Sequence, residues 1–321
     1  MRGATVSQRA RWRQRPLTTT VDRTRTIAVR ERVIVDSHTH VVAADESRYP
    51  LVPFGLDQGV GEERKQAAWF RDVPVSGDGL LAKMDEAGVG AALLVQGVGA
   101  YSYDNAYTVD AAREHPQRFA SVVCVDPLAD GATATLRRLV EEHGARGVRL
   151  FTVTNPESTW LDEDAGLALW RESLRLRIPV VVTILSRQIV KLANALRRFP
   201  DVPVALDHCG FPDLRGGPPY ERASALGDLA AFPNLHLKVT THVLRLAEKD
   251  PAGPAPFVEH LAAIFGAHRL LWGSDFSQTH DRPYADMVAL ARRASAGLGA
   301  TGQARFLGGT ALALWPELRA D

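Results

Sequence analysis

The 321-residue sequence lacks any run of about 18 apolar residues, although hydrophobic residues make up 45% of it. It also lacks a positively charged start that leads into an apolar core, which is how a secretory signal peptide begins. Both absences argue against a membrane-spanning or exported protein and predict a cytoplasmic one. The hydrophobic content is enough for a sizeable core, so we expect a globular chain.

Cysteine is scarce, and a phosphate-binding loop is missing. The two cysteines, Cys124 and Cys209, lie in or just after apolar runs, which predicts buried reduced thiols rather than a disulfide. Cys209 follows His208 and is a candidate nucleophile, but the buried thiol is the favoured interpretation. The glycines at 97 and 99 lack the third glycine and the acidic partner of a dinucleotide-binding loop, so the sequence does not support dependence on NAD or ATP.

The net charge is only +1, but it is unevenly distributed. Residues 1–32 carry nine arginines against two acidic residues, a local charge of +7, so the remainder carries −6. Trp12 is the only aromatic residue of this segment, which argues against a nucleic-acid-binding arm. We expect an Arg-rich, mobile extension over 1–32 and a folded domain over 33–321. Translation from an upstream start codon and a transit peptide remain alternatives for the extension.

From residue 33 onward, short apolar runs alternate with helix-like segments. The runs that predict strands are 33–40, 91–96, 119–125, 147–151, 180–184, 204–207, 235–239 and 269–273. The segments that predict helices are 80–87 after an N-cap at Ser76, 104–115, 132–143, 163–175, 187–199, 220–231, 256–265 and 284–294. This alternation predicts a single (β/α)8 TIM barrel rather than an open doubly wound sheet. We expect the irregular stretch 41–75 to form a functional lid, and two short helices within 303–315 to cap the barrel exterior.

Three of the predicted strands end in polar residues that can bind a metal or move a proton. The first reads Val-Ile-Val-Asp-Ser-His-Thr-His, so an extended backbone places His38 and His40 on one side of the strand. Two other runs end at His208 and at Asp275. The carboxyl ends of barrel strands face a common mouth, so we expect these four side chains to form the active site.

Seven short motifs follow one another along the chain. They are Asp36 to His40, Arg48-Tyr49-Pro50, Met84 to Val89, Gly147 to Leu150, Leu206-Asp207-His208, Trp272 to Asp275 and Leu307 to Ala311. Together they resemble the amidohydrolase-2 (amidohydrolase-related) branch of the amidohydrolase superfamily. Within it, the chain is most similar to lactonase-type members such as 2-pyrone-4,6-dicarboxylate lactonase and the sugar lactonases. The resemblance covers residues 31–318 and implies a TIM-barrel hydrolase with a small-molecule substrate.

One departure from the metal-dependent relatives concerns the fifth strand, which ends in a histidine in those proteins. Here the strand runs from Pro179 to Ile184, and Thr183 occupies that position. Lactonase-type relatives share this absence. The resemblance therefore implies an enzyme that needs no cofactor or uses one weakly bound divalent cation, Zn or Mn, on His38, His40 and Asp275.

The residue types suggest individual roles. We expect Asp275 to be the general base that activates water, because an unpaired buried carboxylate is costly unless it faces a polar site. His208 would stabilise the oxyanion together with His38 or His40. Arg149 suits a substrate carboxylate and equally suits an internal ion pair. Further candidates for binding substrate are Tyr49, Arg187, Lys238, His242 and His280.

The leading hypothesis is a hydrolase that opens a carboxylate-bearing lactone or related cyclic ester. A metal-dependent decarboxylase or hydratase of the same superfamily is the alternative among enzymes. A non-catalytic small-molecule-binding barrel is the alternative of another class. No nucleic-acid or membrane partner is expected, and a homo-oligomer is compatible with the sequence.

Overall fold

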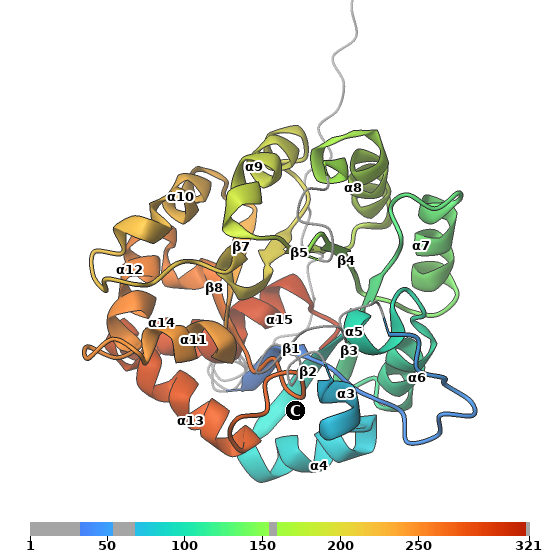
Figure 1. Cartoon of the computed structure of the whole chain (residues 1–321), viewed down its shortest axis with the longest axis horizontal. Coiled ribbons are helices and arrows are strands. Elements are labelled where there is room, and N and C mark those ends of the chain that lie inside the picture. Colours follow the sequence, from blue (N-terminus) through green and yellow to red (C-terminus); the bar gives the residue numbers. More distant parts are fainter. Residues whose placement is uncertain (1–32, 54–67, 154–158, 319–321) are drawn as a thin grey trace, which may run out of the picture.

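A computed structural model describes residues 33–53, 68–153 and 159–318. Eight parallel strands, paired in sequential order from β1 to β8, form its centre (Figure 1). They are β1 Ile34–Thr39, β2 Val89–Val95, β3 Phe119–Cys124, β4 Gly147–Phe151, β5 Val180–Thr183, β6 Val204–Leu206, β7 Leu235–Thr240 and β8 Leu270–Gly273. The predicted TIM barrel is confirmed. Runs such as Val180-Val181-Val182 are apolar on both faces because parallel strands are covered on both sides.

The barrel closes between β8 and β1 through a few backbone hydrogen bonds just beyond the two strands. The backbone N–H of His40 donates to the carbonyl of Phe276 at 2.6 Å, and that of Asp275 donates to the carbonyl of His38 at 2.8 Å. These bonds hold the polar carboxyl ends of the first and last strands against each other.

The helices lie around the strands, most of them in an outer layer (Figure 1). They are α3 Trp69–Asp72, α4 Gly77–Ala87, α5 Val98–Tyr101, α6 Ala106–Glu114, α7 Ala132–Glu141, α8 Asp164–Leu176, α9 Ile189–Arg198, α10 Ser224–Gly227, α11 Thr241–Ala247, α12 Ala255–Phe265, α13 Tyr284–Ala294, α14 Gly299–Ala304 and α15 Thr310–Leu314. α4 begins as predicted at Ser76, whose hydroxyl accepts the Gly79 N–H, and ends at Gly88 in the left-handed conformation. The helix expected over 220–231 is instead three short pieces, of which α10 is the middle one.

The short C-terminal helix α15 does not cap the barrel exterior as the sequence predicts. Ala311 and Trp315 pack against inward-facing strand residues such as Val35 and Leu271, and the Trp315 indole donates to the Arg146 carbonyl at 3.1 Å. Figure 1 shows α15 inside the ring of helices. A large aromatic ring therefore closes the barrel at the end opposite the predicted site.

Two of the predicted segments fall outside the described residues: the Arg-rich extension, 1–32, and the middle of the expected lid, 54–67. The boundary at residue 33 therefore remains a prediction. In the part of the chain that the structure describes, no helix combines the length and the apolar character that a bilayer span requires.

Candidate active site

The two histidines at the end of β1 both direct Nε2 into the barrel mouth. His38 and His40 are fully buried. The Nδ1 of His38 lies 3.0 Å from Asp207 Oδ1, and the Nδ1 of His40 lies 2.8 Å from the carbonyl oxygen of Val95. The Asp207 carboxylate and the Val95 carbonyl only accept hydrogen bonds, and the Lys238 ammonium lies farther from His38 Nδ1, at 3.4 Å. Nδ1 of each ring therefore carries the proton, and Nε2 presents a lone pair.

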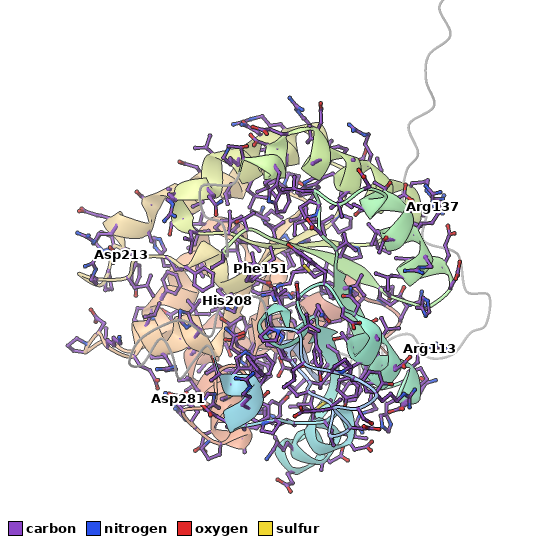
Figure 2. The ribbon with its side chains drawn as sticks, turned by 45° about the vertical axis from the view of Figure 1, so that its right-hand side comes forward. Arg113, Arg137, Phe151, His208, Asp213 and Asp281 are labelled. Carbon is purple, nitrogen blue, oxygen red and sulfur yellow. The ribbon has the colours of Figure 1, made fainter. Side chains whose placement is uncertain are left out.

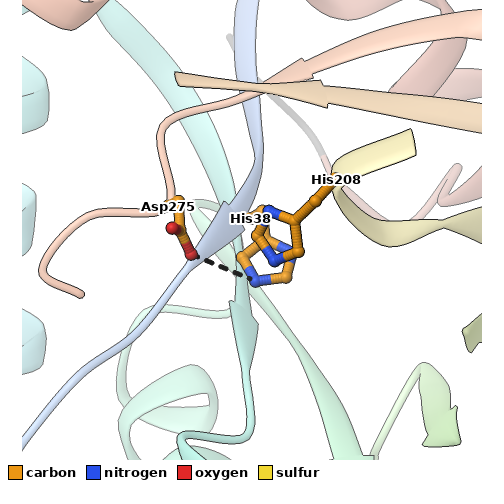
Figure 3. Close-up of side chains that lie close together, drawn as sticks. All are labelled: His38, His208 and Asp275. Carbon is orange, nitrogen blue, oxygen red and sulfur yellow. Dashed lines mark ion pairs between the residues drawn. The ribbon is translucent and has the colours of Figure 1, made fainter. Parts of the chain in front are cut away.

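Asp275 follows β8 and faces these two lone pairs. Its Oδ2 accepts a hydrogen bond from the Thr279 hydroxyl at 2.7 Å. Its Oδ1 lies 3.6 Å from the Nε2 atom of His38 (Figure 3) and 3.6 Å from that of His40. These three atoms are buried and have no hydrogen-bond partner among the described residues.

His208 reaches the same point from a strained turn after β6. His208, Cys209, Gly210 and Phe211 have consecutive φ values of 53°, 50°, 70° and 54°. A left-handed backbone at non-glycine residues is costly and is concentrated at functional sites. The turn places the His208 ring 4.9 Å from that of His38, near the middle of the molecule (Figure 2).

Burial sets the charge of these groups. It lowers the pKa of His38 well below its ordinary value and the pKa of His208 to about 4, so both rings are neutral at neutral pH. Burial alone would raise the pKa of Asp275, but the surrounding imidazoles, led by His208, hold it below its usual range. The site therefore combines one carboxylate with neutral imidazoles.

This combination suits a divalent cation. Ligand atoms of His38, His208 and Asp275 all lie within 4.8 Å of one another (Figure 3). His38 Nε2, His40 Nε2 and Asp275 Oδ1 are buried acceptor atoms that converge without a donor between them, so their lone pairs repel unless a cation or a proton lies there. The predicted metal set contained His40 in place of His208, and His40 borders the same point through Asp275.

A buried cluster of charged and polar side chains lies behind His38, on the side away from Asp275, and we call it the Asp207 cluster. Asp207 Oδ1 accepts from His38 Nδ1 and from Lys238 Nζ at 3.1 Å, and Oδ2 accepts from the Thr183 hydroxyl at 2.7 Å and from Arg149 Nε at 3.1 Å. Burial opposes ionisation, but His38, Lys238 and Arg149 hold the pKa of Asp207 well below its usual value. Thr183, which stands where metal-dependent relatives are expected to have a histidine, is thus a member of this cluster.

Lys238 was predicted to bind substrate, and Arg149 either to bind substrate or to form an internal ion pair; both side chains lie behind the site and pair with Asp207. Lys238 has no exposed surface, and Arg149 is 4% exposed. Arg149 also donates to Thr183 Oγ1 and to the Gln96 carbonyl. Their charged groups are therefore directed at internal acceptors.

The other predicted substrate contacts are dispersed. His242 joins the site, because its ring lies 5.9 Å from that of His208. Tyr49 lies on the lid side, where its hydroxyl donates to Asp110 Oδ2 at 2.7 Å. Arg187 is exposed just after β5. His280 lines a separate cavity of about 410 Å³ between α4 and α13.

Sequence reasoning missed three residues that shape the site. Asp36 binds the backbone N–H groups of Ser274 and His38 through Oδ1 and the Tyr284 hydroxyl through Oδ2. Trp69 in α3 covers His40, with ring centroids 5.4 Å apart. Asp207 was visible only as the residue before His208. Its position directly before a site histidine is the signal that could have found it.

The converging His and Asp side chains lie at the carboxyl ends of the strands of a parallel (β/α)8 barrel, which is where enzymes of this fold have their active sites. A family model described as Amidohydrolase (Amidohydro_2) matches residues 35–316. The chain therefore belongs to this amidohydrolase family, as the motifs predict.

Relatives agree with this placement. An L-fucono-1,5-lactonase of Burkholderia ambifaria is 26% identical over 86% of this chain and 93% of its own. The structure of a candidate 2-pyrone-4,6-dicarboxylic acid hydrolase from Pseudomonas putida is 24% identical, with a TM-score of 0.69 over 89% of this chain and 98% of that one. A zinc-bound amidohydrolase from Burkholderia multivorans is 22% identical, with a TM-score of 0.69 over 88% and 99% of the two chains. The two structures establish the shared fold.

Proposed function

We propose that this amidohydrolase opens lactones by hydrolysis. The observation that carries the proposal is the buried, ionised carboxylate of Asp275, whose Oδ1 lies unpartnered among three imidazoles at the mouth of the barrel. A carboxylate that has kept one oxygen free can accept a proton from water. The lactonase relative supports the choice of a lactone as substrate.

Residues of this chain can accept and return the proton that the hydrolysis moves. Asp275 Oδ1 takes a proton from water as the water oxygen bonds to the lactone carbonyl carbon. The ring C–O bond then breaks, and Asp275 returns the proton to the alkoxide that leaves, which gives a hydroxy acid. His208 can stabilise the oxyanion, because its Nδ1 lies 2.8 Å from the Thr240 hydroxyl and can accept from it, which leaves Nε2–H as a donor.

Of the two roles predicted for His38 and His40, cation binding fits their geometry better than oxyanion stabilisation. With a proton on Nδ1, a neutral imidazole has no N–H at Nε2 to donate to an oxyanion. Both rings are therefore assigned to hold a divalent cation, together with Asp275. When bound, such a cation supplies Lewis-acid stabilisation of negative charge at the carbonyl oxygen.

The placement of Arg149 and Lys238 favours an uncharged lactone over a carboxylate-bearing one. Lys238 and Arg149 are both paired with Asp207, so neither cationic side chain is left free to pair with a substrate carboxylate. L-Fucono-1,5-lactone, which the name of the Burkholderia ambifaria relative contains, is uncharged. We therefore propose a neutral, hydroxyl-rich lactone in place of the carboxylate-bearing lactone predicted from the sequence.

A panel of lactones tests the function. The purified chain is incubated with neutral sugar 1,4- and 1,5-lactones and with carboxylate-bearing lactones, and proton release is followed with a pH indicator. Each assay is run as purified, after chelation, and with Zn²⁺ or Mn²⁺ added back. We expect turnover of neutral lactones that falls on chelation and recovers with the cation; no turnover of any lactone under any condition would overturn the proposal.

The same cation site also fits a decarboxylase or hydratase, which is the alternative among enzymes. Release of CO₂ from a carboxylic acid, or addition of water to a double bond, with lactones inert, would favour it. Ligand-induced thermal stabilisation without any product would instead favour a binding barrel.

A further inference from the structure

The Asp207 cluster holds more positive than negative charge. Asp207 is its only anion, and both Lys238 and Arg149 form ion pairs with it within 3.1 Å. The remaining donors, the Thr183 hydroxyl and the neutral His38 ring, add no charge. The cluster therefore carries a net charge of +1, fixed in the barrel interior.

This charge lies directly behind a predicted metal ligand. Lys238 Nζ is 3.4 Å from His38 Nδ1, on the side of the ring opposite the Nε2 that faces Asp275. Lys238 is fully buried, so water cannot screen its ammonium effectively. Only the width of one imidazole ring would therefore separate a divalent cation on His38 Nε2 from a fixed positive charge.

The charge also acts through the ring itself. A carboxylate that accepts a hydrogen bond from Nδ1 makes Nε2 a better ligand, as in carboxylate–histidine–metal arrangements. Here two cations and a hydroxyl compete for the same carboxylate, so Asp207 polarises His38 less than an unshared carboxylate would. Direct repulsion and reduced polarisation both weaken cation binding.

We propose that Lys238 and Arg149 together form a fixed positive charge beneath the site that keeps its affinity for divalent cations low. Both are positioning residues that act through Asp207 and His38. The inference concerns cation binding alone, so a failed lactone panel would leave it standing, and its own failure would leave lactone hydrolysis standing.

Equilibrium cation binding to the full chain, stripped with a chelator, tests the proposal without any activity measurement. Co²⁺ is titrated and followed by its visible absorption, and Zn²⁺ by competition with a chromophoric chelator. Lys238→Met removes one positive charge and keeps an unbranched side chain of similar length. Arg149→Met removes the other positive charge. In either variant Asp207 keeps one cation, so the cluster becomes neutral. We expect each variant to bind cations about 10- to 100-fold more tightly than the wild type, the range over which residues behind a ligand tune affinity.

Two controls separate charge from packing. Thr183→Val removes a hydrogen bond to Asp207 without changing the charge. Lys191→Met removes a lysine of the outer helix α9 that pairs with Asp162. Thr183→Val should change cation binding far less than the two charge variants do, and Lys191→Met should bind cations as the wild type does. Unchanged or weaker binding in folded Lys238→Met and Arg149→Met would overturn the proposal. If circular dichroism shows that neither variant folds, the wild type decides: micromolar or weaker Kd values for Zn²⁺ support the proposal, and nanomolar values overturn it.

Discussion

At the scale of single residues, the two oxygens of Asp275 have different neighbours. Oδ2 is held by the Thr279 hydroxyl, and Oδ1 faces the lone pairs of His38 and His40. Asp275→Asn should lower turnover by about 10²- to 10⁴-fold, because an amide cannot accept the proton from water. The fold should survive, since the new N–H₂ can donate to the histidine lone pairs and the remaining carbonyl can accept from Thr279. Steady-state rates and melting temperatures, measured on the same preparation, check both expectations.

A matched control for this substitution is Asp286→Asn, which makes the same chemical change at an exposed position in the first turn of α13. It should leave both the rate and the melting temperature unchanged. A folded Asp275→Asn variant with wild-type turnover would remove Asp275 from the mechanism.

At this scale the sequence reveals the residues that point into the site better than those that support it. His38, His40, His208 and Asp275 stand at the ends of apolar runs, where a polar residue requires an explanation, and the structure brings all four together. The Asp207 cluster could not be predicted, because its pairs join residues up to 169 positions apart through a barrel interior that no local pattern describes.

At the scale of elements, contact between β8 and β1 depends on the absence of a side chain at Gly273. A Cβ atom there would lie 2.7 Å from the Cβ of His38 and 3.1 Å from its backbone N. Gly273→Ala should therefore lower the free energy of unfolding by about 1–3 kcal/mol, because it overpacks a closed contact. It should also lower turnover, since β1 and β8 carry His38 and Asp275. Urea unfolding and steady-state kinetics measure the two effects.

Gly227→Ala is the control for this glycine. Gly227 lies in α10 with helical backbone angles, and nothing lies within 4 Å of the added Cβ. Alanine there should be neutral or stabilise the fold by about 0.4–1 kcal/mol. Equal unfolding curves for the wild type and Gly273→Ala would show that the two strands can separate without cost.

Local pattern and tertiary packing explain which elements could be predicted. Strands buried on both faces form apolar runs, and α4 has both a serine N-cap and a glycine at its end, so their bounds are close to those expected. The segment 220–231 has the composition of a helix, but its backbone breaks into three short pieces. The role of α15 was also hidden, because an amphipathic C-terminal segment looks the same whether it packs outside a barrel or closes its end.

At the scale of the whole molecule, the barrel keeps several titratable groups away from water, and they respond to pH in opposite directions. Burial lowers the pKa of His208 and of His236 from 6.5 to about 4, so the folded state favours their neutral forms. Burial raises the pKa of Asp36 from 3.8 to about 6, so the folded state favours its neutral form as well. Between pH 4 and 6.5 the two histidines make the unfolded chain bind more protons than the native one, and Asp36 partly offsets them.

The free energy of unfolding should therefore rise with pH between about 4 and 6.5 and be lost on acidification through that window. His236 isolates one contribution, because it lies on β7 away from the proposed site, with Nδ1 3.2 Å from the Val204 carbonyl. His236→Gln should flatten the rise by roughly 1–3 kcal/mol, since each pKa unit corresponds to about 1.4 kcal/mol. His268→Gln, at an exposed histidine, is the control and should keep the wild-type pH dependence. Urea unfolding at half-unit pH steps gives the three curves. A His236→Gln curve parallel to that of the wild type would show that this half-buried ring does not drive the loss of stability in acid.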